Sequence, residues 1–281
     1  MTASLGWDGL RVEIPAGMEP VILDRGFVRL AGPDLPVLDL RFGPEKAPFN
    51  PDKDGPRLLK ASGIGDARLA PFRASWTRRL KGGVWAAPSA EPRLFVLHPT
   101  EKKAVVAALF SAPPQAILLR SVLESLDWTP PDTWRSWRCY DLRFETPSHS
   151  VLGKASFRPG SFRLEFSIAR STLVFERLAP ASVLLAGEDL EAWLEKKILR
   201  EHARGLSISS SDPTQARFAD PASPWRRILA GLPFNPGQIR GGVRHDEAGN
   251  KILILTERGR LIPAPDFERT FSAYATISIQ G

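Results

Sequence analysis

A short phrase that occurs twice constrains the fold of this chain more than any other feature. The six residues from Leu10 to Pro15 read LRVEIP, and those from Leu142 to Pro147 read LRFETP. In both copies apolar residues alternate with charged or polar ones, which is the pattern of a strand with one buried face. A proline ends each copy, where a further ladder hydrogen bond is no longer needed. The repetition indicates that one β-rich unit is used twice.

A second phrase recurs in the same order along the chain. The sequence KGGV at 81–84 is followed by the apolar run 94–97, and RGGV at 240–243 is followed by the apolar run 252–255. The offset between copies is 132 residues at Leu10 and 159 residues at Gly82. If both matches are equivalent, the second copy contains an insertion of 27 residues, for which the helix described below and the loop at 207–220 are the expected source.

Short alternating segments separated by turn residues fill most of the sequence. This spacing favours antiparallel strands. A helix is expected at about 113–126, because apolar residues fall on one helical face after two prolines. The adjacent prolines Pro130 and Pro131 favour a linker. The chain is expected to close with a strand near 271–279, without a second closing helix.

These patterns predict an α+β protein made of two tandem antiparallel β-sheet units with helices packed on the sheet faces. The first unit is expected at residues 1–128, a proline-rich linker at 129–136, and a diverged second unit with an inserted helix at 137–281.

The clearest helix is expected at 188–204. Acidic residues crowd its first turn and arginines its last, and Gly205 follows, which suits the helix dipole and a left-handed cap. The helical spacing predicts a buried stripe and a water-facing side containing Glu195 and Lys196; the stripe comprises Leu190, Trp193, Leu194 and Ile198.

Composition restricts the classes of function. No stretch approaches the roughly 18 apolar residues of a membrane-spanning helix, and the N-terminus lacks the features of a secretory signal. Cys139 is the single cysteine, which excludes an internal disulfide and favours the cytoplasm. The net charge is +7, but basic residues are dispersed among acidic ones and no nucleic-acid-binding signature occurs. This dispersion disfavours nucleic acid as a partner without ruling it out, and a protein partner is expected.

No residue is assigned a catalytic, cofactor-binding or metal-binding role. The four histidines lack the spacing of a metal pair, and the sequence around Ser148, His149 and Ser150 lacks the strand–turn–helix setting of a nucleophile. His245 and Asp246 at a hairpin tip form the remaining candidate pair. The glycine pairs at 82–83 and 241–242 precede strands, so a strand bend is favoured over a phosphate loop. Cys139 is expected to be a buried apolar residue.

One basic and aromatic cluster is the candidate site for a partner. It combines the basic end of the long helix with a nearby tryptophan and two arginines, and it comprises Lys196, Lys197, Arg200, Trp225, Arg226 and Arg227. Such a cluster suits an acidic partner, although a charge run of this kind also occurs on ordinary solvated surfaces.

The element order of residues 8–128, which is strands, a short helix, a strand meander and a closing helix, resembles the PsbP-like fold. That family includes photosystem extrinsic proteins and small Ran-binding proteins, and the resemblance implies partner binding without enzymatic activity. We therefore expect a non-enzymatic soluble interaction or assembly protein.

The alternative is a hydrolase or small-molecule-binding enzyme whose site converges only in the fold. A concave pocket with several titratable groups would favour the enzyme, and a flat face with exposed aromatics the interaction protein.

Overall fold

The structure is a computed structural model that describes residues 3–15, 17–44, 48–65, 68–79, 82–87, 89, 91–98, 104–128, 133–201, 205–221 and 238–277. These residues fall into two compact units, which are treated separately below. The first unit extends to Leu142 and the second comprises Arg143–Ile277.

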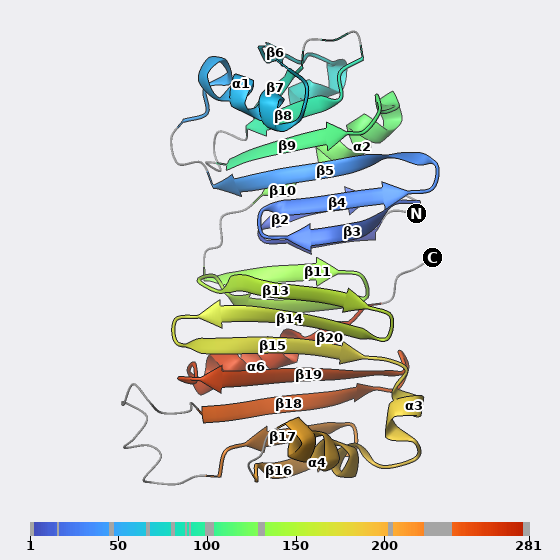
Figure 1. The fold of residues 1–281 in the computed structure, drawn as a ribbon, viewed down its shortest axis with the longest axis vertical. Helices are drawn as coiled ribbons and strands as arrows, with labels where there is room; N and C mark the ends of the chain where they lie inside the picture. The colour runs from blue at the N-terminus through green and yellow to red at the C-terminus, as the bar shows by residue number, and fades with distance from the viewer. Residues whose placement is uncertain are drawn as a thin grey trace. The chain divides into compact units, whose positions relative to one another are not determined.

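The first unit consists of short strands, two α-helices and one 3₁₀ turn (Figure 1). In chain order its elements are β1 (Ala3–Trp7), β2 (Leu10–Ile14), β3 (Glu19–Asp24), β4 (Phe27–Gly32), β5 (Leu35–Pro44), α1 (Pro51–Ala61), β6 (Ala70–Pro71), η1 (Ser75–Arg79), β7 (Gly83–Ala86), β8 (Leu94–His98), β9 (Ala104–Phe110), α2 (Ala116–Ser125), β10 (Asp127–Trp128) and β11 (Trp134–Cys139).

The described part of the second unit consists of strands and three α-helices. Its elements are β12 (Leu142–Pro147), β13 (Val151–Arg158), β14 (Ser161–Ile168), β15 (Ser171–Leu178), α3 (Ala181–Leu185), α4 (Leu190–Glu201), β16 (Ser207–Asp212), β17 (Gln215–Ala219), β18 (Gln238–Asp246), β19 (Lys251–Gly259), α6 (Ala264–Ala273) and β20 (Ala275–Thr276).

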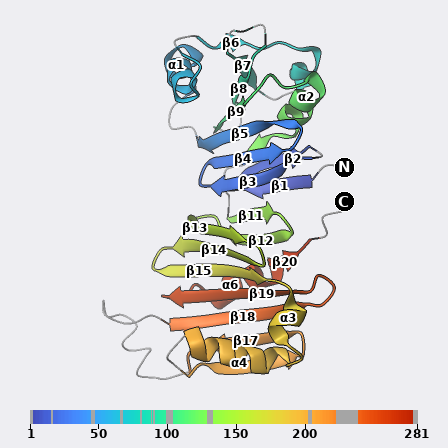
Figure 2. The same ribbon diagram turned by 45° about the vertical axis from the view of Figure 1, so that its right-hand side comes forward.

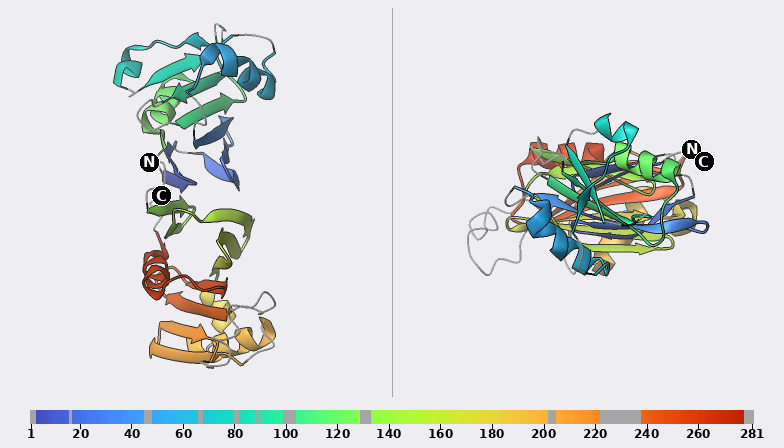
Figure 3. Two further views of the ribbon diagram at one scale, coloured as in Figure 1. Left: turned by 90° about the vertical axis from the view of Figure 1, so that its left-hand side faces the viewer. Right: turned by 90° about the horizontal axis from the view of Figure 1, so that it is seen from above.

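Each unit is built on an antiparallel sheet of seven strands, and the two sheets have the same strand order. The first runs β3-β4-β5-β9-β8-β7-β6 and the second β13-β14-β15-β19-β18-β17-β16. A third sheet has six strands and includes β10, β2, β1 and β11 of the first unit in that order. Figure 3 shows α1 and α2 on opposite faces of the first seven-stranded sheet, and α4 and α6 on opposite faces of the second.

The edge strands β3 and β13 are both interrupted by a bulge. The register shifts between Pro20 and Ile22 in β3, and between Leu152 and Lys154 in β13. Val21, the extra residue of the first bulge, and the adjacent Ile22 have exposed fractions of 56% and 42%. The bulge therefore leaves two apolar side chains at the edge of the first sheet in contact with water.

The predicted fold class, an α+β protein with two sheet units, is wrong. The described residues are mostly β, in three antiparallel sheets with few helices. The prediction failed because β1, β2, β10 and β11 belong to a separate sheet, whereas alternation along a strand does not say which sheet the strand joins.

The expected closing strand near 271–279 is also wrong, because residues 264–273 form α6. Pro263 is the N-cap and Pro265 lies in the first turn, where proline suits a helix. Phe267 and Phe271, four residues apart, are buried on one face of α6. The short strand β20 follows after Tyr274.

The two repeated phrases differ in whether the structure places their copies in corresponding strands. LRVEIP lies in β2 and LRFETP in β12, and each strand directly precedes the seven strands of its unit. The second phrase does not occupy matching strands. Residues 94–97 lie in β8, the fifth strand of its sheet, whereas residues 252–255 lie in β19, the fourth strand of the other sheet, between β15 and β18. The insertion of 27 residues inferred from this match is therefore not supported.

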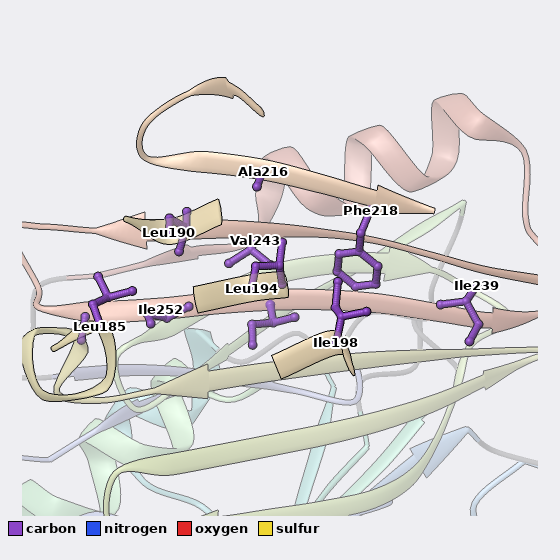
Figure 4. Close-up of a cluster of buried hydrophobic side chains, with 11 residues drawn as sticks. Leu185, Leu190, Leu194, Ile198, Ala216, Phe218, Ile239, Val243 and Ile252 are labelled. Carbon is purple, nitrogen blue, oxygen red and sulfur yellow. The ribbon is translucent and has the colours of Figure 1, made fainter. Parts of the chain in front are cut away.

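The expected buried stripe of the long helix is confirmed for three of its four members. Leu190, Leu194 and Ile198 are almost fully buried, and they pack against apolar residues of β17, β18 and β19 (Figure 4). Trp193 is only partly buried at the margin of this cluster. Glu195 and Lys196 face water as expected. Figure 2 shows α4 lying over β17.

Candidate functional site

The described residues include only part of the predicted partner-binding cluster. Lys196 is exposed and forms an ion pair with Glu188. Lys197 is half-buried on the same helix, and Arg200 lies in the last turn of α4. The side chain of Arg200, and all of Trp225, Arg226 and Arg227, lie outside the described residues. The described part of this cluster is a charged helix surface, and it does not by itself define a site.

A hollow of about 450 Å³ lies at the end of the β18–β19 hairpin. Its lining includes Thr214, Arg244, His245, Asp246 and Thr276. The predicted His245–Asp246 pair thus borders a cavity, but Asp246 accepts hydrogen bonds from the Thr276 hydroxyl and the Gly249 amide. Within the described residues, no hydrogen bond joins the imidazole of His245 to a nucleophile. The arrangement lacks the linked nucleophile, base and orienting acid of a hydrolase.

A second hollow, of about 460 Å³, lies along α2. It is lined by residues of α2 and by Glu13 of β2, and it includes Ile117, which is 82% exposed. Arg120 and Glu124 pair with each other across one helical turn. This hollow presents one apolar side chain among paired charges and no grouping of reactive side chains.

The outer surface of β3, β4 and β5 carries an arginine–aromatic face that sequence analysis missed. We define the Phe27 face as Val21, Ile22, Phe27, Arg29, Asp39 and Arg41. The guanidinium of Arg41 lies 5.2 Å from the centroid of the Phe27 ring, and that of Arg29 lies 5.9 Å from it. Cation–π contacts of this kind hold long side chains in place at a protein surface.

An ion pair fixes Arg29 within the Phe27 face. Its Nε and one Nη donate to the two carboxylate oxygens of Asp39, at 2.6 and 2.7 Å. The two residues are directly opposite each other in β4 and β5. Arg41 is exposed and forms no ion pair with any described residue. The face thus combines one neutralised arginine, one arginine without a carboxylate partner, and adjacent apolar groups.

The second unit has a comparable ion pair on β14 and β15. Arg163 donates to Glu176 at 2.6 Å, and these two residues are directly opposite each other. Arg163 also donates to Glu165 at 3.0 Å. Ser161 begins β14 where Phe27 begins β4, so no aromatic ring lies at that position. The arginine–aromatic contact of these strands lies at the next position, where the guanidinium of Arg177 is 4.4 Å from the centroid of the Phe162 ring.

A polar node holds the β1–β2 and β3–β4 turns of the first unit. The Asp8 carboxylate accepts a hydrogen bond from the Gly26 amide and forms an ion pair with Arg135. The guanidinium of Arg135 also lies 5.8 Å from the Trp137 ring. Burial raises the pKa of Asp8 above its usual 3.8, and this effect exceeds the opposing effects of Arg135 and Gly26.

We expect Asp8→Asn to change how stability depends on pH. Because the pKa of Asp8 is raised by folding, its contribution is fully present below pH 3.8 and is lost as the pH rises through the folded-state pKa. The free energy of unfolding of the unaltered protein, minus that of Asp8→Asn, should therefore decrease from about pH 4 upward. Urea unfolding at several pH values measures this difference. An increase with pH would mean that attraction to Arg135 outweighs burial.

Potential metal ligands are not gathered together in the described part of the chain. Among those residues, no group of three or more histidine, cysteine or acidic side chains is placed to hold a metal ion. Cys139 is buried as expected, and burial raises the pKa of its thiol. No helix in the same ranges is long and apolar enough to cross a bilayer.

Comparisons with known proteins give weak fold likeness only. No protein family and no curated protein matches the sequence. The Saccharomyces cerevisiae Ran-binding protein Mog1p is 9% identical with a TM-score of 0.35, over 51% of this chain and 95% of that chain. MucB, solved in complex with MucA(peri), is 11% identical with a TM-score of 0.20, over 96% of this chain and 82% of that chain. The expected PsbP-like resemblance is thus supported only as weak fold similarity, and these scores carry no functional argument.

Proposed function

We propose that this chain is a non-enzymatic interaction protein that binds a protein partner through the Phe27 face. The observation that carries the proposal is the stacking of Arg29 and Arg41 against Phe27 beside two exposed apolar side chains. Arginine and aromatic residues are enriched among the side chains that dominate protein interfaces. Stacking and the Asp39 pair already restrict both arginines, so ordering them on binding costs less conformational entropy.

The charge pattern of the Phe27 face indicates the chemistry of the partner. Asp39 is neutralised by Arg29, and the nearby Asp24 accepts from the amide of Arg25 at 2.7 Å. Arg41 has no carboxylate partner among the described residues. A partner segment with a carboxylate for Arg41, next to apolar side chains for Val21 and Ile22, would complement the face.

The enzyme alternative has less support from the described residues. The β18–β19 hollow has the titratable lining expected of an enzyme, but its Asp246 is engaged by Thr276 and Gly249. A turnover abolished by His245→Ala would favour the alternative.

We also propose that the chain is an internal repeat, with each half descended from one ancestral unit. The identical strand orders support this. So do two tight turns: Gly26 and Gly160 both have positive φ, and an added Cβ at either would lie 2.8 Å from a carbonyl oxygen. In both turns the glycine carbonyl accepts a backbone hydrogen bond, from Phe42 at 3.0 Å and from Ala179 at 2.8 Å.

The paired arginines support the same proposal. Arg29 lies three residues after Gly26, and Arg163 three residues after Gly160. Each forms an ion pair with the acid directly opposite on the next strand.

Cross-linking from the Phe27 face tests the proposed function. A photoreactive p-benzoylphenylalanine in place of Ile22 should capture one specific partner from cells, which mass spectrometry then identifies. With that partner purified, we expect Arg41→Glu to weaken binding at least about tenfold, because it turns attraction to a carboxylate into repulsion. Isothermal titration calorimetry measures the change.

Arg170→Glu is the matched control, since Arg170 is exposed in the β14–β15 turn and changes the net charge equally. Binding should be unchanged in this variant. A captured partner that binds Arg41→Glu as well as the unaltered protein would rule out the Phe27 face as its site. Absence of any specific cross-link from residue 22 would do the same.

A further inference from the structure

Arg244 is a cation at the β18–β19 hollow without a carboxylate partner among the described residues. One of its Nη groups donates to the Tyr274 carbonyl at 2.9 Å, and its guanidinium lies 5.0 Å from the centroid of the Phe271 ring. Its Nε is buried and finds no hydrogen-bond acceptor in the described structure. A buried donor without an acceptor is costly, so such a group is a reason to look for a missing ligand.

A second guanidinium increases the positive charge beside Arg244. Arg217 lies 3.6 Å from the centroid of the same Phe271 ring. Arg217 has a carboxylate partner, Glu268, at 2.7 Å, whereas Arg244 has none in the described ranges. Burial, and then the charge of Arg217, lower the pKa of Arg244 below its usual value. Among the described residues, no carboxylate compensates the charge of Arg244.

The two acids that line the hollow limit the charge of any ligand. Asp246 is held by the Thr276 hydroxyl and, at 3.1 Å, by the Gly249 amide. Glu247 lies beside it in the hairpin turn. Both repel anions, so a ligand with one negative charge is favoured over a phosphate dianion. The hollow, at about 450 Å³, is large enough for a small organic acid.

We propose that this hollow binds a small monocarboxylate, whose carboxylate pairs with Arg244. The planar guanidinium matches a carboxylate in shape and supplies several donors. Leu253, which is directly opposite Arg244, and Ala275 contribute apolar wall to the same hollow. The proposal is independent of the Phe27 face, which lies in the other unit.

A titration followed by ¹H–¹⁵N NMR tests this site on the full chain. Sodium acetate is the probe, with sodium chloride and inorganic phosphate as separate arms at equal ionic strength. We expect acetate to shift the amide signals of Gly249 and Thr276 saturably in the millimolar range, while chloride produces no saturable shift. Phosphate should bind more weakly than acetate.

Arg244→Met should lose the saturable shift, and Arg170→Met, which alters an exposed arginine away from the hollow, should keep it. No saturable response to acetate, an equal response to chloride, tighter binding of phosphate, or an unchanged response in Arg244→Met would each overturn the proposal. If Arg244→Met does not fold, the titrations of the unaltered protein decide the question alone, with the milder variant Arg244→Lys expected to weaken acetate binding.

Discussion

Replacing Glu257 by alanine is expected to destabilise the protein by about 3–5 kcal/mol, because it leaves a buried cation uncompensated. The Glu257 side chain is fully buried. It accepts hydrogen bonds from the Arg240 Nε at 2.7 Å, the Ser171 hydroxyl at 2.8 Å and the Ile262 amide at 2.6 Å. All three donors lose this acceptor in Glu257→Ala, and the Ser171 hydroxyl keeps only the Arg258 carbonyl at 3.3 Å. Urea unfolding of the variant and the unaltered protein measures the difference.

Removing the cation together with Glu257 should reverse much of this loss. Arg240 and Glu257 are directly opposite each other in β18 and β19. The double variant Arg240→Phe, Glu257→Ala should recover most of the lost stability, since apolar residues often replace a buried ion pair without cost.

Two results would contradict this account of Glu257. A double variant no more stable than Glu257→Ala would assign the loss to the Ser171 hydroxyl and the Ile262 amide. Glu268→Ala is the exposed counterpart, because Glu268 pairs with Arg217 at the surface. Glu268→Ala should lower the free energy of unfolding by less than about 1 kcal/mol. A decrease similar to that of Glu257→Ala would show that burial of Glu257 is not the cause of its large effect.

Truncating Trp7 to alanine should cost about 3–5 kcal/mol, the usual range for removing a large core aromatic. Trp7 is fully buried in β1. Its indole N–H donates to the Asp24 carbonyl at 2.8 Å, and its ring meets that of Trp137 edge to face, with the centroids 5.1 Å apart. The variant loses apolar burial, a ring contact and a hydrogen bond together. Thermal and urea unfolding followed by circular dichroism measure the cost.

Trp7→Phe separates these contributions, because it keeps an aromatic ring but not the N–H. It should lose less stability than Trp7→Ala. The remaining loss comes from the Asp24 carbonyl, which no longer has the indole N–H as its hydrogen-bond donor. Ile117→Ala serves as the exposed control and should change stability by no more than about 0.5 kcal/mol. A cost below about 1 kcal/mol for Trp7→Ala would mean that β1 is not part of the core of its unit.

Local patterns in the sequence predicted individual elements better than their arrangement. The 3.6-residue spacing of Leu190, Leu194 and Ile198 reports one helix face, and the structure buries that face. The alternation of apolar and charged residues in LRVEIP predicts a strand, but it does not show which sheet that strand joins. The repeated GGV phrase gave a wrong alignment of the two halves of the sequence. Gly83 lies in β7 and Gly242 in β18, and these strands occupy different places in their sheets.

The Phe27 face was beyond sequence analysis for a related reason. Phe27 and Arg29 lie two residues apart on β4, but Arg41 joins them only through the pairing of Phe27 with Arg41 across β4 and β5. The uncompensated charge of Arg244 likewise depends on α6, which brings Phe271 and Tyr274 to β18. The sequence around residue 271 had instead suggested a strand. Both features arise from register and packing between distant segments, which a single sequence does not display.

The bulge in β3 has a consequence for self-association. An edge strand with exposed apolar residues normally offers its free backbone groups as a template for another strand, which is a route to fibrils. In β3, Pro20 supplies no amide hydrogen, and the register breaks before Ile22. The uninterrupted ladder needed for edge-to-edge growth is missing where the apolar pair is exposed. Val21 and Ile22 are therefore accessible to a partner's side chains without opening the sheet to polymerisation.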